Sequence, residues 1–418
     1  MGSLYLPLFP LLLMALLLSV QSKTHWEDTQ VLKQLKNALD PTSISSGSCV
    51  DSWDFSLDPC DNLFGEKFTC GFRCDAVVSG VSRVTELNLD QAGYSGSLSS
   101  VFWNLPFLQT LDLSNNFFSG SVPDTFSNLT RLRSLSLSAN MFSGEVPPSI
   151  GSLSALEELY LNGNGFNGSV PASFVGLVSL QRLELQSNGF TGVFPDLGVL
   201  KNLYYLDGSD NGFSGELPAV LPTSLVQLSM RNNSFEGVVP SGIRDLVNLQ
   251  VVDLSHNRFS GSVPAVLFEH PSLEQLTLSF NQFSAVETPD SDGVHSGLIA
   301  VDLSDNEITG FLPPFLALMP KLSALSLENN NFTGMIPILY AFKTAAPEPG
   351  ISPFVRLLLG GNYLFGPIPE PLRRMKPDTA TVRLAGNCLF WCPTLFFFCQ
   401  GGEQKSLVEC RSAGPIIP

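Results

Sequence analysis

The apolar residues of the chain recur in a fixed frame that ends on asparagine. The clearest copy, residues 108–116, reads L-x-x-L-x-L-x-x-N, and most steps between copies are 22 to 25 residues long. The later frame asparagines are Asn140, Asn164, Asn188, Asn211, Asn233, Asn257, Asn281, Asn306, Asn330 and Asn362. Degenerate copies at both ends, with Ala92 and Asn387 at the same position, bring the total to about thirteen units. Such a period predicts a solenoid, in which each unit packs on its neighbours.

Each unit is expected to contain one short strand. The x-L-x-L-x core alternates with period two, so its leucines face inward and the residues between them face outward. Parallel stacking of these strands makes one long sheet. The frame asparagine turns inward where the strand ends, and its amide satisfies backbone groups of its own turn and the adjacent one.

The second half of each unit is equally regular. Residues 118–123 read F-S-G-S-V-P, and the pattern returns at 142–147, 259–264 and 332–337. The Phe is expected to fill the core beneath the turn. The Gly permits a backbone conformation that other residues resist. The Pro limits the convex-side segment to an extended path, and it has no backbone N–H to donate to a neighbouring strand.

The frame is interrupted twice. After Phe283 the Gly and Pro signals are replaced by a polar stretch, residues 284–297. The step from Asn330 to Asn362 is about eight residues too long, and the surplus lies in residues 338–354. Insertions in solenoids usually emerge on one face, often the binding face. Neutral loop drift is the alternative interpretation.

The eight cysteines form two sets that flank the repeats. They are Cys49, Cys60, Cys70 and Cys74 on one side, and Cys388, Cys392, Cys399 and Cys410 on the other. Even sets in a secreted chain indicate small disulfide-stapled caps, with three possible pairings in each. Zinc binding at Cys388-x3-Cys392 is the alternative. It is disfavoured, because histidine ligands are lacking nearby and the compartment is expected to be oxidising.

The first 22 residues carry no charged side chain and include an apolar run from Leu4 to Val20. They are interpreted as a signal peptide that is removed near Ser22, so the protein is expected outside the cell. The domain boundaries that follow are a cap at 23–83, the repeats at 84–386, and a C-terminal cap and tail at 387–418. No later stretch is long enough to span a bilayer.

Composition excludes several function classes. The formal net charge of -16 should repel nucleic acid and anionic lipid. Residues 163–168 match G-x-G-x-x-G, but these glycines are the turn signals of the repeat. Residues 207–212 imitate the start of a calcium loop, but Pro218 stands where the bidentate Glu should be. No catalytic motif is present, so no enzyme activity, cofactor or metal is expected.

The combined pattern L-x-x-L-x-L-x-x-N-x-F-S-G-x-V-P resembles the plant-specific leucine-rich repeat. The segment before it, with Trp53, 58–60 (D-P-C) and 74–75 (C-D), looks like the N-terminal cap of plant receptor-like proteins and receptor-kinase ectodomains. The resemblance covers residues 24 to 410. It implies a right-handed, twisted superhelix with a parallel sheet on its concave face and a 3-10 or irregular convex side. Two departures are the four cysteines of the first cap, where many relatives have two, and the lack of a following transmembrane helix or kinase domain.

A candidate ligand surface lies in the units that end at Asn164, Asn188 and Asn211. Its outward residues are Glu158, Tyr160, Asn162, Arg182, Glu184, Gln186, Tyr205, Asp207 and Ser209. Adjacent strands lie about 4.8 Å apart, so these side chains should form one patch. Tyr and Arg are frequent interface anchors. The alternative interpretation is that these polar residues face solvent and bind no ligand.

Secretion also makes four sequons candidates for N-glycosylation. Their asparagines are Asn128, Asn167, Asn232 and Asn331, all in or beside turns. We expect glycans on two or more of them.

The resemblance favours an extracellular recognition protein, in defence or development. It would bind a peptide, protein or wall-derived ligand, and would act through a membrane partner such as a receptor-kinase or co-receptor ectodomain. The alternative is an inhibitor of secreted cell-wall-degrading enzymes, similar to the plant polygalacturonase inhibitors. Those inhibitors carry about ten units of the same repeat.

Overall fold

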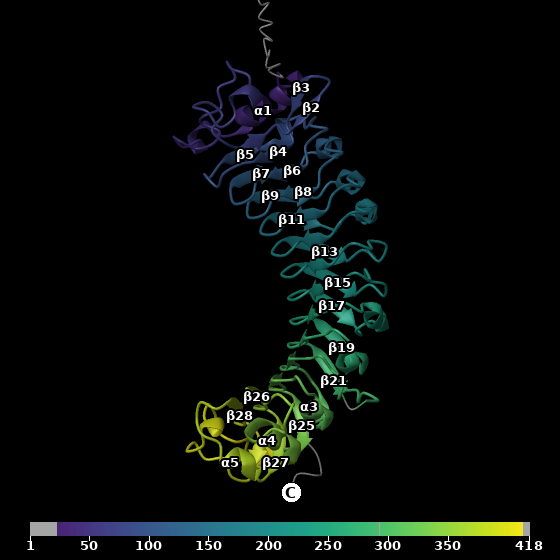
Figure 1. Ribbon diagram of the computed structural model, residues 1–418. Helices are drawn as coiled ribbons and strands as arrows, with labels where there is room; N and C mark the ends of the chain where they lie inside the picture. Colours follow the sequence, from purple (N-terminus) through teal and green to yellow (C-terminus); the bar gives the residue numbers. More distant parts are fainter. Residues whose placement is uncertain (1–22, 292, 413–418) are drawn as a thin grey trace, which may run out of the picture.

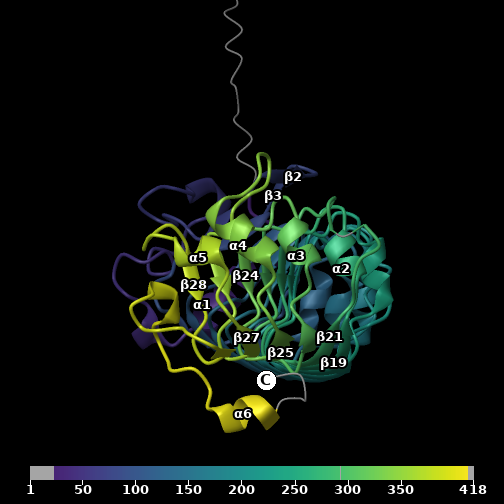
Figure 2. The same ribbon diagram turned by 90° about the horizontal axis from the view of Figure 1, so that it is seen from below.

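The computed structural model describes residues 23–291 and 293–412, so the expected signal peptide lies outside the described residues. The chain winds into a curved solenoid with a cap at each end (Figure 1). Seen from its C-terminal end, each coil has three sides (Figure 2). One side is a long main sheet, the second is a lateral sheet, and the third carries short helices and turns.

The main sheet has 14 strands, and it begins with β1 (Phe72–Arg73), which is antiparallel to its neighbour. The parallel strands are β4 (Glu86–Asn88), β6 (Thr110–Asp112), β8 (Ser134–Ser136), β10 (Glu158–Tyr160), β12 (Arg182–Glu184), β14 (Tyr205–Asp207), β16 (Gln227–Ser229), β18 (Val251–Asp253), β20 (Gln275–Thr277), β22 (Ala300–Asp302), β24 (Ala324–Ser326), β26 (Arg356–Leu358) and β28 (Thr381–Arg383). The central Leu or Val of each parallel strand is buried, which confirms the expected inward phase.

The frame asparagines connect consecutive coils, as expected. The Nδ2 of Asn281 donates to the carbonyls of Leu278 and Ser279 in its own unit, and to that of Leu254 one coil earlier, at 3.1, 3.2 and 3.0 Å. Its Oδ1 accepts from the backbone N–H of Phe259 at 3.0 Å. One buried side chain thus satisfies four backbone groups that would otherwise lack partners.

The lateral side was not expected to form strands, but the Phe-Ser-Gly segments pair there in two parallel sheets. The nine-stranded sheet contains β5 (Ser95–Ser97), β7 (Phe117–Gly120), β9 (Met141–Glu145), β11 (Gly165–Gly168), β13 (Gly189–Val193), β15 (Gly212–Glu216), β17 (Ser234–Gly237), β19 (Arg258–Val263) and β21 (Gln282–Val286). The four-stranded sheet contains β23 (Thr309–Phe311), β25 (Asn331–Gly334), β27 (Tyr363–Gly366) and β29 (Cys388–Leu389). The phenylalanines beneath are buried as expected, and Phe118 and Phe142 stack at 6.2 Å between ring centroids.

The break between the two lateral sheets coincides with the first interruption of the sequence frame. Gly261, in the preceding unit, has a φ of +78°, a conformation that favours glycine. Ala285 stands in the corresponding position opposite β19, and the register shifts there. Strand β21 ends at Val286, and the described residues between it and β22 form a loop in place of the Gly-x-Val-Pro segment of the earlier units.

The third side carries one short helix or 3-10 turn in most coils. These are η4 (Asp124–Asn128), η5 (Pro148–Ser152), η6 (Ala172–Gly176), η7 (Ser241–Asp245), α2 (Val266–Glu269), α3 (Phe315–Leu318), α4 (Ile338–Ala345) and α5 (Glu370–Arg373). In Figure 1 the coiled ribbons beside β7 to β21 follow the outer edge of the curve. None of the helices in the described ranges is long and apolar enough to cross a bilayer.

Each cap is closed by its own two disulfides. The structure pairs Cys49 with Cys70 and Cys60 with Cys74 at the N-terminal end. At the other end it pairs Cys388 with Cys410 and Cys392 with Cys399. These bonds resolve the pairings that the spacing left open, and they consume the thiolates that a zinc site would need. The described residues contain no group of acidic, His or Cys side chains arranged to hold a metal ion.

The N-terminal cap covers the exposed end of the core. It contains α1 (Trp26–Ala38), η1 (Pro41–Ser43), η2 (Cys60–Asn62) and the hairpin β2 (Ala76–Val78) with β3 (Val81–Arg83). The first repeat unit then carries η3 (Leu98–Ser100). The C-terminal cap adds η8 (Phe397–Cys399) and α6 (Leu407–Ser412). Val31, Leu32 and Leu35 of α1 are buried in a core that continues through the repeats.

The second interruption of the frame forms α4, which buries a lysine. Lys343 is 3% exposed, its Nζ donates to the Met319 carbonyl, and its ammonium lies 5.0 Å from the centroid of the Phe354 ring. Burial lowers its pKa from 10.5 to about 8. No carboxylate of a described residue forms an ion pair with it.

This lysine makes stability depend on alkaline pH. Between pH 8 and 10.5 the folded protein has released the Lys343 proton while the unfolded chain keeps it, so stability rises with pH in this window. We expect the free energy of unfolding of Lys343→Met to be about 2–3 kcal/mol higher than that of the wild type near pH 7. The difference should shrink towards pH 10. Urea titrations of both proteins at several pH values measure it, and parallel pH profiles would contradict the assignment.

Candidate functional site

The expected ligand surface lies on three adjacent parallel strands of the main sheet, β10, β12 and β14. The strand register aligns Glu158 with Arg182 and Tyr205 in one row. Tyr160, Glu184 and Asp207 form the next row. Asn162, Gln186 and Ser209 follow at the ends of the strands. The structure therefore brings together the residues that the sequence pattern selected. Whether they bind a ligand stays a prediction.

Arg182 is the centre of this patch. Its guanidinium lies 3.6 Å from the ring centroid of Tyr205 on one neighbouring strand, and 5.9 Å from that of Tyr160 on the other. Glu184, on the same strand, accepts from Arg182 Nε at 2.6 Å, and Gln186 Nε2 donates to Glu184 at 2.9 Å. Cation–π contacts and a charge-assisted hydrogen bond thus hold the side chains in one arrangement before any ligand arrives.

Burial shapes the electrostatics of the patch. It raises the pKa of Tyr160 to about 12, and the charge of Glu158 adds to this effect, so the phenol remains a donor at neutral pH. Burial would lower the pKa of Arg182, but Glu184 more than offsets this and the pKa ends above its usual value. Burial also raises the pKa of Asp207, against the hydrogen bonds that it accepts from Ser209.

Two amide oxygens at the strand ends of the patch are left without partners among the described residues. Asn162 Oδ1 and Gln186 Oε1 are buried atoms that accept no hydrogen bond from the described residues. An unmet buried acceptor costs about 1–3 kcal/mol. A ligand with N–H or O–H donors that reached these oxygens would recover part of that cost.

The rest of the main sheet lacks the aromatic side chains of this patch. Tyr160 and Tyr205 are the only outward-facing aromatic residues on its parallel strands. Elsewhere outward aspartates support the local turn. Asp253 and Asp302 each accept from the backbone N–H and the hydroxyl of a serine two residues on. The three-strand patch therefore differs from the rest of the face in its aromatic content.

The four sequons differ in accessibility. Asn167 and Asn331 are exposed on lateral strands, and Asn128 is half-buried at the end of η4. Asn232 is exposed, but its Nδ2 donates to Asp210 at 2.8 Å, and a glycan would take one of the two hydrogens of that nitrogen. Glycosylation stays a prediction, and the structure favours Asn167 and Asn331 as its sites.

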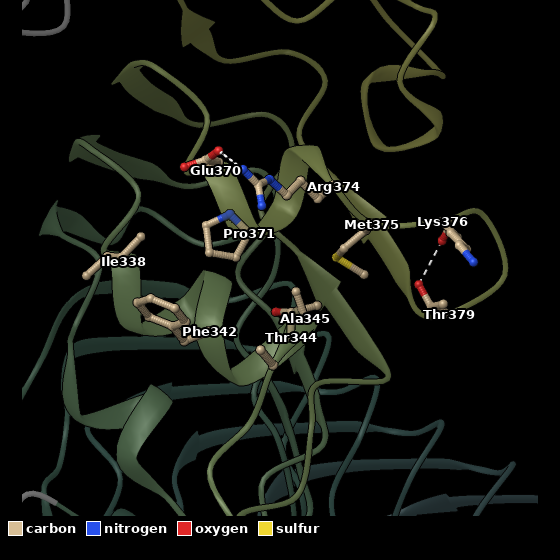
Figure 3. Close-up of a pocket in the computed structure, with 11 residues that line it drawn as sticks. Ile338, Phe342, Thr344, Ala345, Glu370, Pro371, Arg374, Met375, Lys376 and Thr379 are labelled. Carbon is tan, nitrogen blue, oxygen red and sulfur yellow. Dashed lines mark hydrogen bonds and ion pairs between the residues drawn. The ribbon is translucent and has the colours of Figure 1, made fainter.

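One structural feature escaped sequence reasoning altogether. An apolar pocket lies between α4 and α5, and its lining includes Ile338, Phe342, Pro371 and Met375 (Figure 3). The only sequence signal was the surplus length of residues 338–354. That surplus could not show that apolar side chains would face solvent.

Comparison with known families decides the class of the repeats. Residues 82–142 and 223–283 match the family model described as "Leucine rich repeat". Residues 155–177 match a second model of the same description. The chain is a leucine-rich-repeat protein. A comparison with curated proteins found no match.

Solved leucine-rich-repeat structures extend the comparison. The plant peptide hormone receptor RGFR1, in complex with RGF2, is 26% identical with a TM-score of 0.66, over 77% of this chain and 50% of that one. A TDR receptor is 29% identical with a TM-score of 0.63, over 77% and 53% of the two chains. A leucine-rich-repeat protein of Leptospira interrogans is 25% identical with a TM-score of 0.58, over 77% of each chain. This chain thus matches about half the length of the receptor ectodomains, at low identity.

Proposed function

We propose that this leucine-rich-repeat protein is an extracellular recognition protein that binds a peptide or protein through β10, β12 and β14. The observation that carries the proposal is the Tyr160–Arg182–Tyr205 arrangement, braced by Glu184. The similarity to a plant peptide hormone receptor in complex with RGF2 supports it. The four disulfides suit an oxidising compartment. The proposal assigns no catalytic role, and the function would be exercised with a membrane partner.

The geometry suits a ligand with exposed backbone and mixed side chains. Braced aromatic rings offer contact area at a low cost in side-chain entropy, because their rotamers are already restricted. Glu184 neutralises Arg182, whereas Glu158 forms no ion pair with a described residue and accepts from the Ser134 hydroxyl at 3.1 Å. The patch therefore offers aromatic faces next to a carboxylate. A peptide that pairs an apolar side chain with a basic one complements it.

Single substitutions test this surface. Tyr205→Ala and Arg182→Ala should each weaken ligand binding by more than about 1 kcal/mol, because each removes part of the braced centre. Their melting temperatures should stay close to that of the wild type, since both side chains are partly exposed. The ligand is first captured from plant apoplastic fluid and membranes on the immobilised protein, then titrated by calorimetry.

Thr277→Ala provides the control, because Thr277 occupies the row of Tyr160 and Asp207 several strands away. Unchanged affinity in both patch variants would move the site elsewhere on the repeats. The alternative function, inhibition of secreted wall-degrading enzymes, is tested separately with fungal polygalacturonases. Inhibition that Arg182→Ala abolishes would replace receptor-type recognition as the role of the same patch.

A further inference from the structure

The helix α4 is amphipathic, but its polar face is buried and its apolar face is exposed. Its buried residues include Tyr340, Lys343 and Thr344, which are polar. Its apolar residues Ile338 and Phe342 are each 48% exposed. In a soluble protein the apolar face of a helix normally packs on the core. An apolar cluster left facing solvent instead marks a place where something binds.

The buried polar face has its own partners, so the helix is not simply misoriented. Tyr340 donates its hydroxyl hydrogen to the Pro313 carbonyl at 2.8 Å, and Thr344 donates to the Tyr340 carbonyl at 2.7 Å. Lys343 donates to the Met319 carbonyl. The bonds to Pro313 and Met319 reach outside the helix, so they fix the orientation of α4 about its axis. They therefore hold Ile338 and Phe342 on the outside.

The exposed side chains of α4 form one wall of a pocket, and α5 with the segment after it forms the other (Figure 3). Figure 3 shows Phe342 and Ile338 below Pro371, and the thioether of Met375 above Ala345. The volume of the pocket is about 630 Å³. That lies within the range of sites that bind small molecules, about 300–1,000 Å³.

The charge at the rim of the pocket is positive, although the whole chain carries -16. The lining contains Arg374, Lys376 and Glu370 as its charged residues. Arg374 is paired with Glu370, one helical turn away. Lys376 forms no ion pair with any described residue. One uncompensated ammonium group therefore borders an apolar cavity.

We propose that this pocket is a binding site for a small amphiphilic carboxylate, such as a medium-chain fatty acid. Its apolar body would pack against Phe342, Ile338 and Met375, and its carboxylate would face Lys376. Apolar walls with few polar groups are typical of small-molecule sites, in which the polar groups set the orientation of the ligand. The site lies on the helical side of the solenoid and is independent of the main-sheet patch.

Decanoate, 1-decanol and decylamine test the site, because they share one chain and differ in head-group charge. Calorimetric titration of the whole secreted chain should give a dissociation constant of roughly 10–100 µM for decanoate. Decanol should bind more weakly, and decylamine more weakly still, because its ammonium faces that of Lys376.

Three variants localise the binding. Phe342→Ser should weaken decanoate binding about tenfold or more, since it removes the largest apolar wall. Lys376→Gln should weaken decanoate binding about threefold to tenfold and leave decanol binding unchanged. Arg373→Gln is the matched control, because Arg373 is an exposed cation of α5 outside the lining, and it should bind decanoate like the wild type.

Three results would overturn the proposal. The first is no saturable decanoate binding up to about 1 mM. The second is decylamine binding as tight as decanoate binding. The third is wild-type affinity in Phe342→Ser, which would place the ligand elsewhere. Both pocket substitutions are at solvent-exposed positions, so unchanged melting temperatures check that the fold is intact.

Discussion

Replacing Asp28 with Ala should lower the free energy of unfolding of the N-terminal cap by about 3–5 kcal/mol. The Asp28 carboxylate is fully buried and accepts from Arg83 at Nε and Nη2, at 2.9 and 2.6 Å. It also accepts from the backbone N–H of Val84 at 2.8 Å. The substitution leaves a buried guanidinium and a buried N–H without their partner. Stranded groups of this kind account for most of the loss when a buried pair is broken.

The double variant Asp28→Leu with Arg83→Met is the control, because it removes both charges and keeps apolar volume. It should be less damaging than Asp28→Ala. Hydrogen exchange is the appropriate measurement, since a solenoid can open at one end while its other repeats stay folded. Faster exchange should be confined to α1 and the first strands. A loss below about 1 kcal/mol would mean that water replaces the carboxylate.

The regular part of this fold could be predicted because each unit repeats the same local chemistry. Period-two leucines specify the phase of the main-sheet strands, and Leu159 and Leu183 are both fully buried. The frame asparagine must satisfy backbone groups wherever a strand ends inside the core. The bonds of Asn281 follow that rule.

Contacts outside the repeat could not be predicted in the same way. Asp28 and Arg83 are 55 residues apart, and nothing in the repeat frame relates α1 to β3. The spacing of the cysteines allowed three pairings in each cap. The lateral strands were missed because the Phe-Ser-Gly segment reads as a turn, and its strand pairing depends on the coil before it.

The candidate site was predictable in position but not in detail. Outward phase and adjacent strands place Tyr160, Arg182 and Tyr205 side by side. The pattern could not show that Arg182 is neutralised by Glu184 and stacked on Tyr205, because rotamers decide both contacts. This pairing changes the expected ligand. A free guanidinium would attract acidic groups, whereas in this patch the charge without an ion-pair partner among the described residues is the carboxylate of Glu158.

Replacing Leu185 with Ala should lower the free energy of unfolding by about 2–5 kcal/mol, as for other buried leucines. Leu185 is fully buried, and its carbonyl accepts from Asn188 of its own unit and Asn211 of the next. The cavity would therefore lie beneath two linked coils, whose asparagine bonds limit how far the backbone can relax into it.

Ser136→Ala is the matched control, because Ser136 is on the outward face of the main sheet, opposite to the face that carries Leu185. Ser136 is half-buried in β8, and among the described residues its hydroxyl hydrogen-bonds only with that of Ser138, at 3.1 Å. Its loss should stay within about 0.5 kcal/mol. Urea titration of both variants, followed by circular dichroism, measures the contrast. Because a slip of one residue exchanges the two faces of a strand, equal losses at Leu185 and Ser136 could arise only if the inward phase were assigned wrongly.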